Sequence, residues 1–258
     1  FFLSNPMGTS YDEFLRTGGE NQLWIQGVSG SNVPDASRGN TNLFTFNEEK
    51  QVPVLGGGET DSWETPSGMG QGSRGKGFIL FPFADDNNDG NPDGNDKVID
   101  NLANPQTSGS FTFSLTATDW DGNSGIGTDE GWNLLGNPYL TYLDWTTFGC
   151  GGGRGGITSN CSETVYVVEP GGGYKSFNGT KDGTVNDPVT FERDGIIGPF
   201  QAFFVKATGP DPELEITDIT AVQTDAVNSD GDFNDAFLKS QENNGTIISL
   251  DLELQETT

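Results

Sequence analysis

Short apolar runs alternate along this chain with glycine-rich polar segments, and several of the runs alternate apolar and polar residues with a period of two. That period is the spacing of one face of a β-strand, so it predicts strands with one buried face. No stretch keeps a helical period, although 232–239 would allow one helical turn. We therefore expect an all-β protein, a β-sandwich of jelly-roll type. The expected strands lie within 1–15, 23–25, 43–46, 77–83, 111–118, 164–169, 171–178, 196–206, 214–222 and 247–254.

The segment 131–145, GWNLLGNPYLTYLDW, predicts a strand, a tight turn and a second run rich in aromatic residues. Glycine and asparagine tolerate the positive φ of tight turns, and Pro138 fixes its own φ and pushes Asn137 toward extended geometry. We interpret the aromatic residues of this corner as packing residues and assign none of them to catalysis.

The outline of this corner occurs twice. FLSNPMGTSYDEFL (2–15) resembles it, with Tyr11 aligned to Tyr142, and the run 75–83 resembles 198–207. The alternating strand 108–118 likewise resembles 244–255. Repetition of this kind predicts a duplicated β unit, with a first unit at 1–107 and a second at 108–258.

The corner GWNLLGNPYLTYLDW, followed by IIGPFQAFFVKA (196–207), resembles the repeated module of large secreted surface proteins of Bacteroidota that leave the cell by type IX secretion. The resemblance covers most of the second half of the chain and, more weakly, the first. It implies a β-rich, extracellular or cell-surface protein, and it implies no set of catalytic residues.

Charge narrows the range of partners. The chain carries 38 acidic and 12 basic residues, a net charge of −26. Nucleic-acid binding needs clusters of Lys and Arg, so we expect no nucleic-acid partner, and anionic membrane surfaces are disfavoured too. No apolar run reaches the roughly 18 residues of a membrane-spanning helix, so we expect no membrane insertion. The charge favours bound cations, high-salt tolerance or simply solubility.

One acidic stretch, DDNNDGNPDGND (85–96), has the spacing of a calcium loop, with oxygen side chains at positions 1, 3, 5, 9 and 12 and glycine at position 6. Its last position is aspartate, as in the calcium loops of dockerins and thrombospondin-type repeats, which it resembles. The alternative is a solvated acidic turn. The predicted calcium ligands are Asp85, Asn87, Asp89, Asn91, Asp93 and Asp96, and a less regular second candidate comprises Asn228, Asp230, Asp232 and Asn234.

The two cysteines, Cys150 and Cys161, flank the glycine-rich segment CGGGRGGITSNC. We expect a disulfide in preference to two free thiols, because secreted proteins fold in oxidising surroundings. Two cysteines and no histidine make a zinc site improbable.

Catalysis has little support in the sequence. The chain has no histidine, which excludes a Ser-His-Asp or Cys-His arrangement. A polysaccharide-cleaving enzyme with two carboxylates stays open, because the separation of carboxylates cannot be read from sequence. Trp24, Trp63 and Trp120 are the candidates for stacking on sugars, although burial in the core explains them as well.

The order of the repeated elements suggests self-assembly. The strand near Phe111 leads into a corner, whereas the matching strand at 247–254 has no corner after it and the corner at 1–6 has no strand before it. A fragment boundary would give the same pattern. Our leading hypothesis is a non-enzymatic extracellular subunit of a filament or surface layer, stabilised by calcium and joined head to tail by strand exchange between copies. The alternative is an adhesin or carbohydrate-binding module, with glycans as partners and the loops around Trp63 and Trp120 as the site. The predicted subunit contacts are Phe1, Phe2, Leu3, Ile248, Leu250, Leu252 and Leu254.

Overall fold

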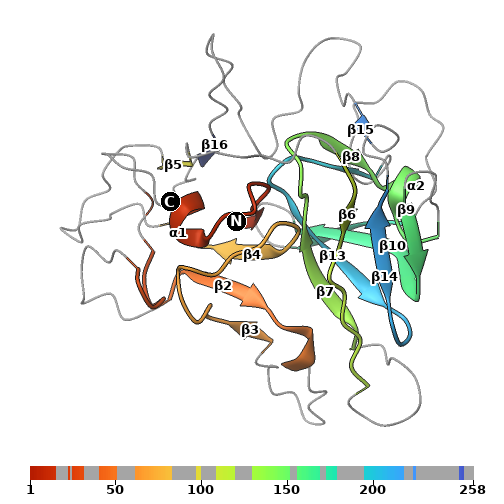
Figure 1. Cartoon of the computed structure of the whole chain (residues 1–258), viewed down its shortest axis with the longest axis horizontal. Coiled ribbons are helices and arrows are strands. Elements are labelled where there is room, and N and C mark those ends of the chain that lie inside the picture. The colour runs from red at the N-terminus through yellow and green to blue at the C-terminus, as the bar shows by residue number, and fades with distance from the viewer. Residues whose placement is uncertain are drawn as a thin grey trace.

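The computed structural model is built mostly of short antiparallel strands, which confirms the all-β, sandwich-like prediction (Figure 1). It describes residues 1–15, 23, 25–31, 41–50, 62–82, 97–99, 109–119, 130–151, 156–168, 173–178, 195–217, 223–224 and 250–252. Elements up to residue 112 are β1 (Phe2–Ser4), α1 (Tyr11–Leu15), β2 (Leu43–Phe46), the 3-10 turn η1 (Glu48–Lys50), β3 (Trp63–Glu64), β4 (Gly77–Leu80), β5 (Lys97–Ile99) and β6 (Phe111–Thr112). The others are β7 (Trp132–Gly136), β8 (Tyr142–Asp144), α2 (Trp145–Phe148), β9 (Gly156–Ser159), β10 (Cys161–Val168), β11 (Tyr174–Phe177), β12 (Ile196–Ile197), β13 (Ala202–Ala207), β14 (Glu213–Ile216), β15 (Gln223–Thr224) and β16 (Leu250–Leu252).

Two four-stranded sheets form the centre of the molecule, and both have the same strand order. The first is ordered β1-β4-β2-β3 and the second β7-β13-β10-β11. Numbered along the chain, each sheet therefore has the order first, fourth, second, third. Registers also correspond, since Ser4 faces Gly77 and Leu3 faces Phe78, while Gly136 faces Ala202 and Leu135 faces Phe203.

The asparagine of each Asn-Pro corner makes the same two local hydrogen bonds. Asn5 Nδ2 donates to the Thr9 carbonyl at 2.8 Å, and Asn5 Oδ1 accepts from the Met7 amide at 3.0 Å. Asn137 Nδ2 donates to the Thr141 carbonyl at 2.8 Å, and Asn137 Oδ1 accepts from the Tyr139 amide at 2.9 Å. Both asparagines are buried, and these bonds satisfy backbone groups that the turn removes from the sheet.

A short helix follows each corner, which the sequence pattern did not predict. Ser10 and Glu13 form a reciprocal capping arrangement at α1, and Asp144 accepts from the Thr146 amide at α2. The first residue of each helix packs edge-on against the second residue of a central strand, Tyr11 against Phe78 and Trp145 against Phe203. The structural counterpart of Tyr11 is therefore Trp145 and not Tyr142, because the second corner is two residues longer before its helix cap.

The two sheets meet where β1 and β4 approach β7 and β13. Leu3 bridges to Gln201, and Leu135 bridges to Lys76. The Ser4 amide donates to the Phe200 carbonyl at 2.8 Å, and the Gly136 amide donates to the Gly75 carbonyl at 3.0 Å. We call residues 1–107 the first half of the chain and residues 108–258 the second half. Each of these contacts from one half to the other is matched by the reverse contact at the corresponding positions.

Small residues make this junction possible. A Cβ on Gly136 would lie 2.3 Å from Ser4 Cβ and 2.8 Å from the Lys76 carbonyl oxygen, and a Cβ on Gly77 would lie 2.9 Å from Ala202 Cβ. Such distances leave no room for a side chain. The residues that touch across the junction, Ser4 with Gly136 and Gly77 with Ala202, occupy corresponding positions in the two sheets.

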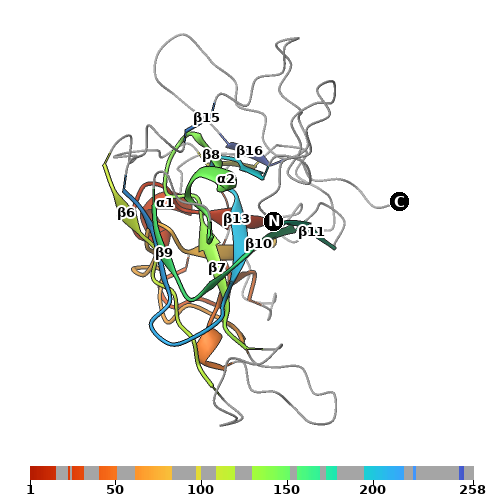
Figure 2. The ribbon, with the colours of Figure 1, turned by 90° about the vertical axis from the view of Figure 1, so that its right-hand side faces the viewer.

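Three clusters of buried side chains surround the sheets. One face of the second sheet packs its core against α2, β8, β12 and β14, and one face of the first sheet packs against α1 and the side chains of Leu23, Ile25 and Val28. A third cluster joins the opposite faces of the two sheets, where Phe204 contacts the rings of Phe2, Phe46 and Trp63. Figure 2 shows the strands of the two sheets from the side.

Further strands complete the structure. Two three-stranded sheets have the orders β12-β8-β15 and β6-β14-β9, and β16 pairs with β5. The pairing of β16 with β5 connects the predicted unit 108–258 to the predicted unit 1–107. Two expected strands differ in the structure: Leu23 and Ile25 are buried but lie outside any strand, and β6 spans only Phe111–Thr112 of the expected 111–118.

We expect Gly136→Ala to lower the free energy of unfolding by about 3 kcal/mol, because the added methyl group overlaps Ser4 and the Lys76 backbone. Urea denaturation measures this change. Gly70→Ala is the matched control, since a Cβ at Gly70 has no atom within 4 Å and should change stability by less than about 0.5 kcal/mol. Equal effects of the two substitutions would contradict the close packing of the junction.

Candidate functional site

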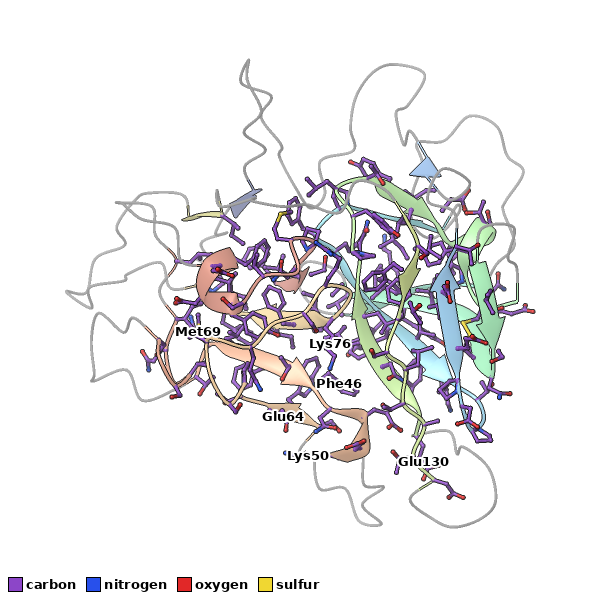
Figure 3. The ribbon with its side chains drawn as sticks, in the orientation of Figure 1. Phe46, Lys50, Glu64, Met69, Lys76 and Glu130 are labelled. Carbon is purple, nitrogen blue, oxygen red and sulfur yellow. A yellow bond between two sulfur atoms is a disulfide. The ribbon has the colours of Figure 1, made fainter. Side chains whose placement is uncertain are left out.

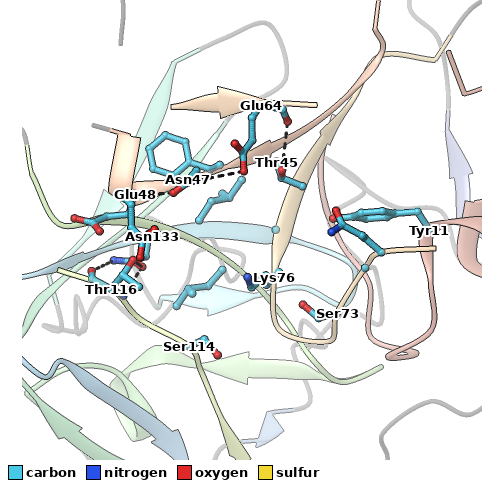
Figure 4. A pocket seen from close by; sticks show the side chains of 17 residues that line it. Tyr11, Thr45, Asn47, Glu48, Glu64, Ser73, Lys76, Ser114, Thr116 and Asn133 are labelled. Carbon is cyan, nitrogen blue, oxygen red and sulfur yellow. Dashed lines mark hydrogen bonds between the residues drawn. The ribbon is translucent and has the colours of Figure 1, made fainter. Parts of the chain in front are cut away.

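A groove of about 580 Å³ lies where the two halves of the chain meet (Figure 4). Its first side comes from Tyr11 of α1, the end of β2 with η1, Glu64 of β3 and the segment 71–77. Its second side comes from Ser114, Thr116 and residues 133–135 of β7. Figure 3 labels Lys76, Phe46 and Glu64 near the middle of the molecule. Grooves between structural units are common positions for ligand sites.

Glu48 lines this groove and links the two halves of the chain through hydrogen bonds. Its side chain is 3% exposed. Glu48 Oε1 accepts from the Thr118 amide at 2.8 Å and from the Gly131 amide at 3.3 Å, while Oε2 accepts from the Thr118 hydroxyl at 2.8 Å. A buried carboxylate needs such donors, so Glu48 fixes the entrance to β7 against the turn that ends β2.

Other polar side chains of the groove are hydrogen-bonded to backbone or side-chain groups of the protein. Asn133 Oδ1 accepts from the Thr116 amide at 2.9 Å, and Asn133 Nδ2 donates to the Thr116 carbonyl at 2.8 Å. Glu64 accepts from Lys50 Nζ at 2.5 Å and from Asn47 Nδ2 at 3.2 Å. These bonds hold the residues in place and leave them less free to bond a ligand.

Tyr11 lines the groove from the core of the first half. Its side chain is 3% exposed, and burial raises the pKa of its phenol well above the ordinary value. The phenol is therefore protonated at any physiological pH. Arg74 lies in the loop before β4. Its guanidinium donates to the Pro6 and Met7 carbonyls at 2.8 Å each and so holds the Asn5-Pro6 corner in place.

A second candidate site is the pair of strands β5 and β16. Ile99 faces Leu250 and Val98 faces Asp251, so an apolar pair is followed by a pair that includes a polar residue. In the other half, β6 and β14 pair Phe111 with Ile216 and then Thr112 with Glu215. The sequences FTFSL (111–115) and LDLEL (250–254) alternate in the same phase from these residues onward. In strand pairing, β16 lies beside β5 as β6 lies beside β14.

The predicted subunit contacts are paired within the chain. Phe2 and Leu3 lie in β1, which pairs with β4, and the Phe1 carbonyl accepts from the Leu80 amide at 2.9 Å. Leu250 and Leu252 lie in β16. Ile248 and Leu254 lie outside the described residues.

Both predicted calcium sites lie outside the described residues. β5 begins at Lys97, immediately after Asp96, the last predicted ligand of the first loop. Within the described ranges, no group of three or more Asp, Glu, His or Cys side chains is arranged to hold a metal ion.

The predicted disulfide between Cys150 and Cys161 is confirmed, with a Cα–Cα distance of 5.6 Å. It ties the end of α2 to the first residue of β10 across a sequence separation of 11 residues. On the chain-entropy account, a disulfide that closes a loop of this size stabilises the folded state by roughly 3 kcal/mol.

The tryptophans proposed for sugar stacking have different positions. Trp63 is half-buried and packs edge-on against Phe2 and Phe46 at the junction of the sheets, while Trp24 and Trp120 lie outside the described residues. Sequence reasoning did not find the groove, because its residues come from segments far apart in the chain. No local pattern distinguishes Glu48, which is buried, from Glu49, which is exposed.

We expect Glu48→Ala to lower the free energy of unfolding by about 3 kcal/mol, because it leaves the buried Gly131 amide and the partly buried Thr118 amide without an acceptor. Hydrogen exchange at the Thr118 and Gly131 amides should accelerate as well. Glu49→Ala removes the same charge from an exposed neighbour and should change stability by less than about 0.5 kcal/mol. Unchanged exchange at both amides in Glu48→Ala would contradict the linking role of Glu48.

Comparison of the chain with protein-family models, with curated proteins and with solved structures found no match. In the described part of the chain, no helix has the length and apolar character needed to cross a membrane.

Proposed function

We propose that this chain is a non-enzymatic, extracellular structural protein, a subunit of a surface filament or surface layer. Copies associate through β16, which leaves β5 of its own chain and pairs with β5 of a neighbour. Such an exchange replaces each contact within the chain by the same contact between chains, so it costs little free energy. The contact is head to tail and extends from copy to copy when it does not close into a ring.

The observation that carries this proposal is the correspondence between β16–β5 and β6–β14. In the second half, β6 is followed along the chain by the corner of the same half. The strand β16, in contrast, comes from the far end of the chain and pairs with β5 of the first half. A strand supplied from a distance can come from the same chain or from another copy. The type IX secretion resemblance and the disulfide both support an extracellular location.

We include calcium in the proposal because of the position of the loop 85–96. This loop ends at Asp96, and β5 begins at the next residue. An ion bound by the loop would neutralise its carboxylates and fix the start of β5. Calcium would then favour the pairing of β5 with β16 in either arrangement.

A structural role is also supported by the state of the carboxylates in the groove. Glu48 accepts three hydrogen bonds from the protein, and Glu64 is paired with Lys50. A two-carboxylate hydrolase needs one carboxyl group to donate a proton and one to attack or to activate water. Of the three carboxylates that line the groove, only that of Glu49 has no partner among the described residues, and such a hydrolase needs two.

Engineered cysteines test the exchange directly. Val98→Cys and Asp251→Cys are placed on separate copies that are co-expressed, because these residues face each other in the register of β5 and β16. Exchange between copies should give a disulfide-linked dimer on a non-reducing gel. The doubly substituted chain should give a covalent ladder.

The control combines Val98→Cys with Thr208→Cys, an exposed position away from β16 that should give no specific dimer. If the separate copies form no dimer while the double variant forms a disulfide within one chain, the exchange proposal is wrong.

Calcium binding has its own test. We expect calorimetry to detect calcium binding to the intact chain, and we expect Asp89→Asn combined with Asp93→Asn to weaken it by at least tenfold because two ligand charges are lost. Asp211→Asn, at an exposed turn, is the control and should bind normally. Calcium should raise the melting temperature of the wild-type and control proteins only. No saturable binding to the wild-type chain would exclude the calcium part of the proposal.

A further inference from the structure

The groove between the two halves contains polar side chains that the fold itself does not use. Its lining combines the apolar residues Leu134, Leu135 and Phe46 with residues that carry hydroxyl or charged groups. Its volume of about 580 Å³ falls within the range of small-molecule sites, roughly 300–1,000 Å³. The site is independent of β5 and β16.

Hydroxyl groups are the main unused groups. The side chains of Tyr11, Ser73 and Ser114 line the groove, and no described residue forms a hydrogen bond with any of the three hydroxyls. They come from α1, from the loop before β4 and from the segment after β6, so three separate elements direct them to one space. Each hydroxyl can donate one hydrogen bond and accept others.

The charges around these hydroxyls are nearly balanced. Lys76 lies near the middle of the groove in Figure 4, and no described residue forms an ion pair with it. Glu49 lines the same groove, and its carboxylate also has no partner among the described residues. The carboxylates of Glu48 and Glu64 accept hydrogen bonds from other residues of the protein. Among the described residues that line the groove, Lys76 and Glu49 are therefore the positive and the negative group left for a ligand.

This combination selects a neutral ligand with many hydroxyl groups. An anionic ligand would meet Glu49 and Glu64 together with the field of a chain whose net charge is −26. A purely apolar ligand would remove water from three hydroxyls without replacing their hydrogen bonds. A sugar offers hydroxyls that both donate and accept, and its C–H faces can contact the half-buried ring of Phe46.

We propose that the groove binds a short segment of a neutral oligosaccharide. Tyr11, Ser73 and Ser114 bond its hydroxyls, and Lys76 donates to its ring or hydroxyl oxygens. The site differs from the tryptophan loops that the sequence suggested, because Trp63 packs into the junction of the sheets. A protein assembled on a surface would present such grooves in many copies.

Calorimetric titration of the intact chain tests this proposal, with cello-, malto-, manno- and xylo-oligosaccharides as neutral probes and oligogalacturonate as the anionic probe. At least one neutral probe should bind saturably, and oligogalacturonate should bind at least tenfold more weakly. Tyr11→Phe combined with Ser114→Ala should weaken the binding of the neutral probe by about tenfold or more, because two hydrogen bonds to the ligand are lost.

The matched control is Tyr166→Phe combined with Ser176→Ala, which changes the same residue types on β10 and β11, away from the groove. It should bind the neutral probe like the wild type. Circular dichroism checks that both double variants are folded, and Lys76→Gln, at an exposed position, serves as a second groove variant. The proposal is overturned if no neutral probe binds, if oligogalacturonate binds equally well, or if the groove variants bind like the control.

Discussion

The close approach of the two sheets is the contact on which the rest of this structure depends. Ser4 touches Gly136 and Gly77 touches Ala202, and each half donates a backbone hydrogen bond to the other at corresponding positions. Because the backbones come so near, the side chains on either side of the junction are pushed into separate clusters, a core for each half and an aromatic cluster between them. A groove remains beside the junction, where the two halves diverge. The small residues therefore determine both the packing of the fold and the place of its candidate ligand site.

Matched contacts on both sides of this junction support the inference that the chain is a duplicated unit. Equal strand order in the central sheets could arise independently, but the reciprocal pairing of Leu3 with Gln201 and of Leu135 with Lys76 is the pattern that a two-fold relation between the halves would give. In such an arrangement, a strand added to one half implies a position for a strand in the other. This gives a physical reason for β16 to pair with β5, because β6 occupies the corresponding position beside β14.

The sequence predicted the features that depend on neighbouring residues. β2, β4 and the Asn-Pro corners follow from apolar runs and turn residues, and the disulfide follows from two cysteines around a glycine-rich loop. Helices α1 and α2 were missed because four or five residues are too few to show a helical period, although Ser10 and Glu13 have the spacing of a capping box. The groove could not be predicted, since it exists only after distant segments have packed. Glu48 differs from its neighbour only through that packing.

The two candidate sites respond to different physical variables. In the proposed function, pairing of β5 with β16 depends on backbone hydrogen bonds and, through the predicted calcium loop that ends at Asp96, on a divalent cation. The groove depends on hydroxyls and nearly balanced charges, so a cation bound elsewhere has little influence on it. Strong acidity of the whole chain acts on both in the same direction, because it favours cations at the loop and disfavours anions at the groove. A protein that assembles in response to calcium and binds neutral glycans would therefore combine these functions without either site disturbing the other.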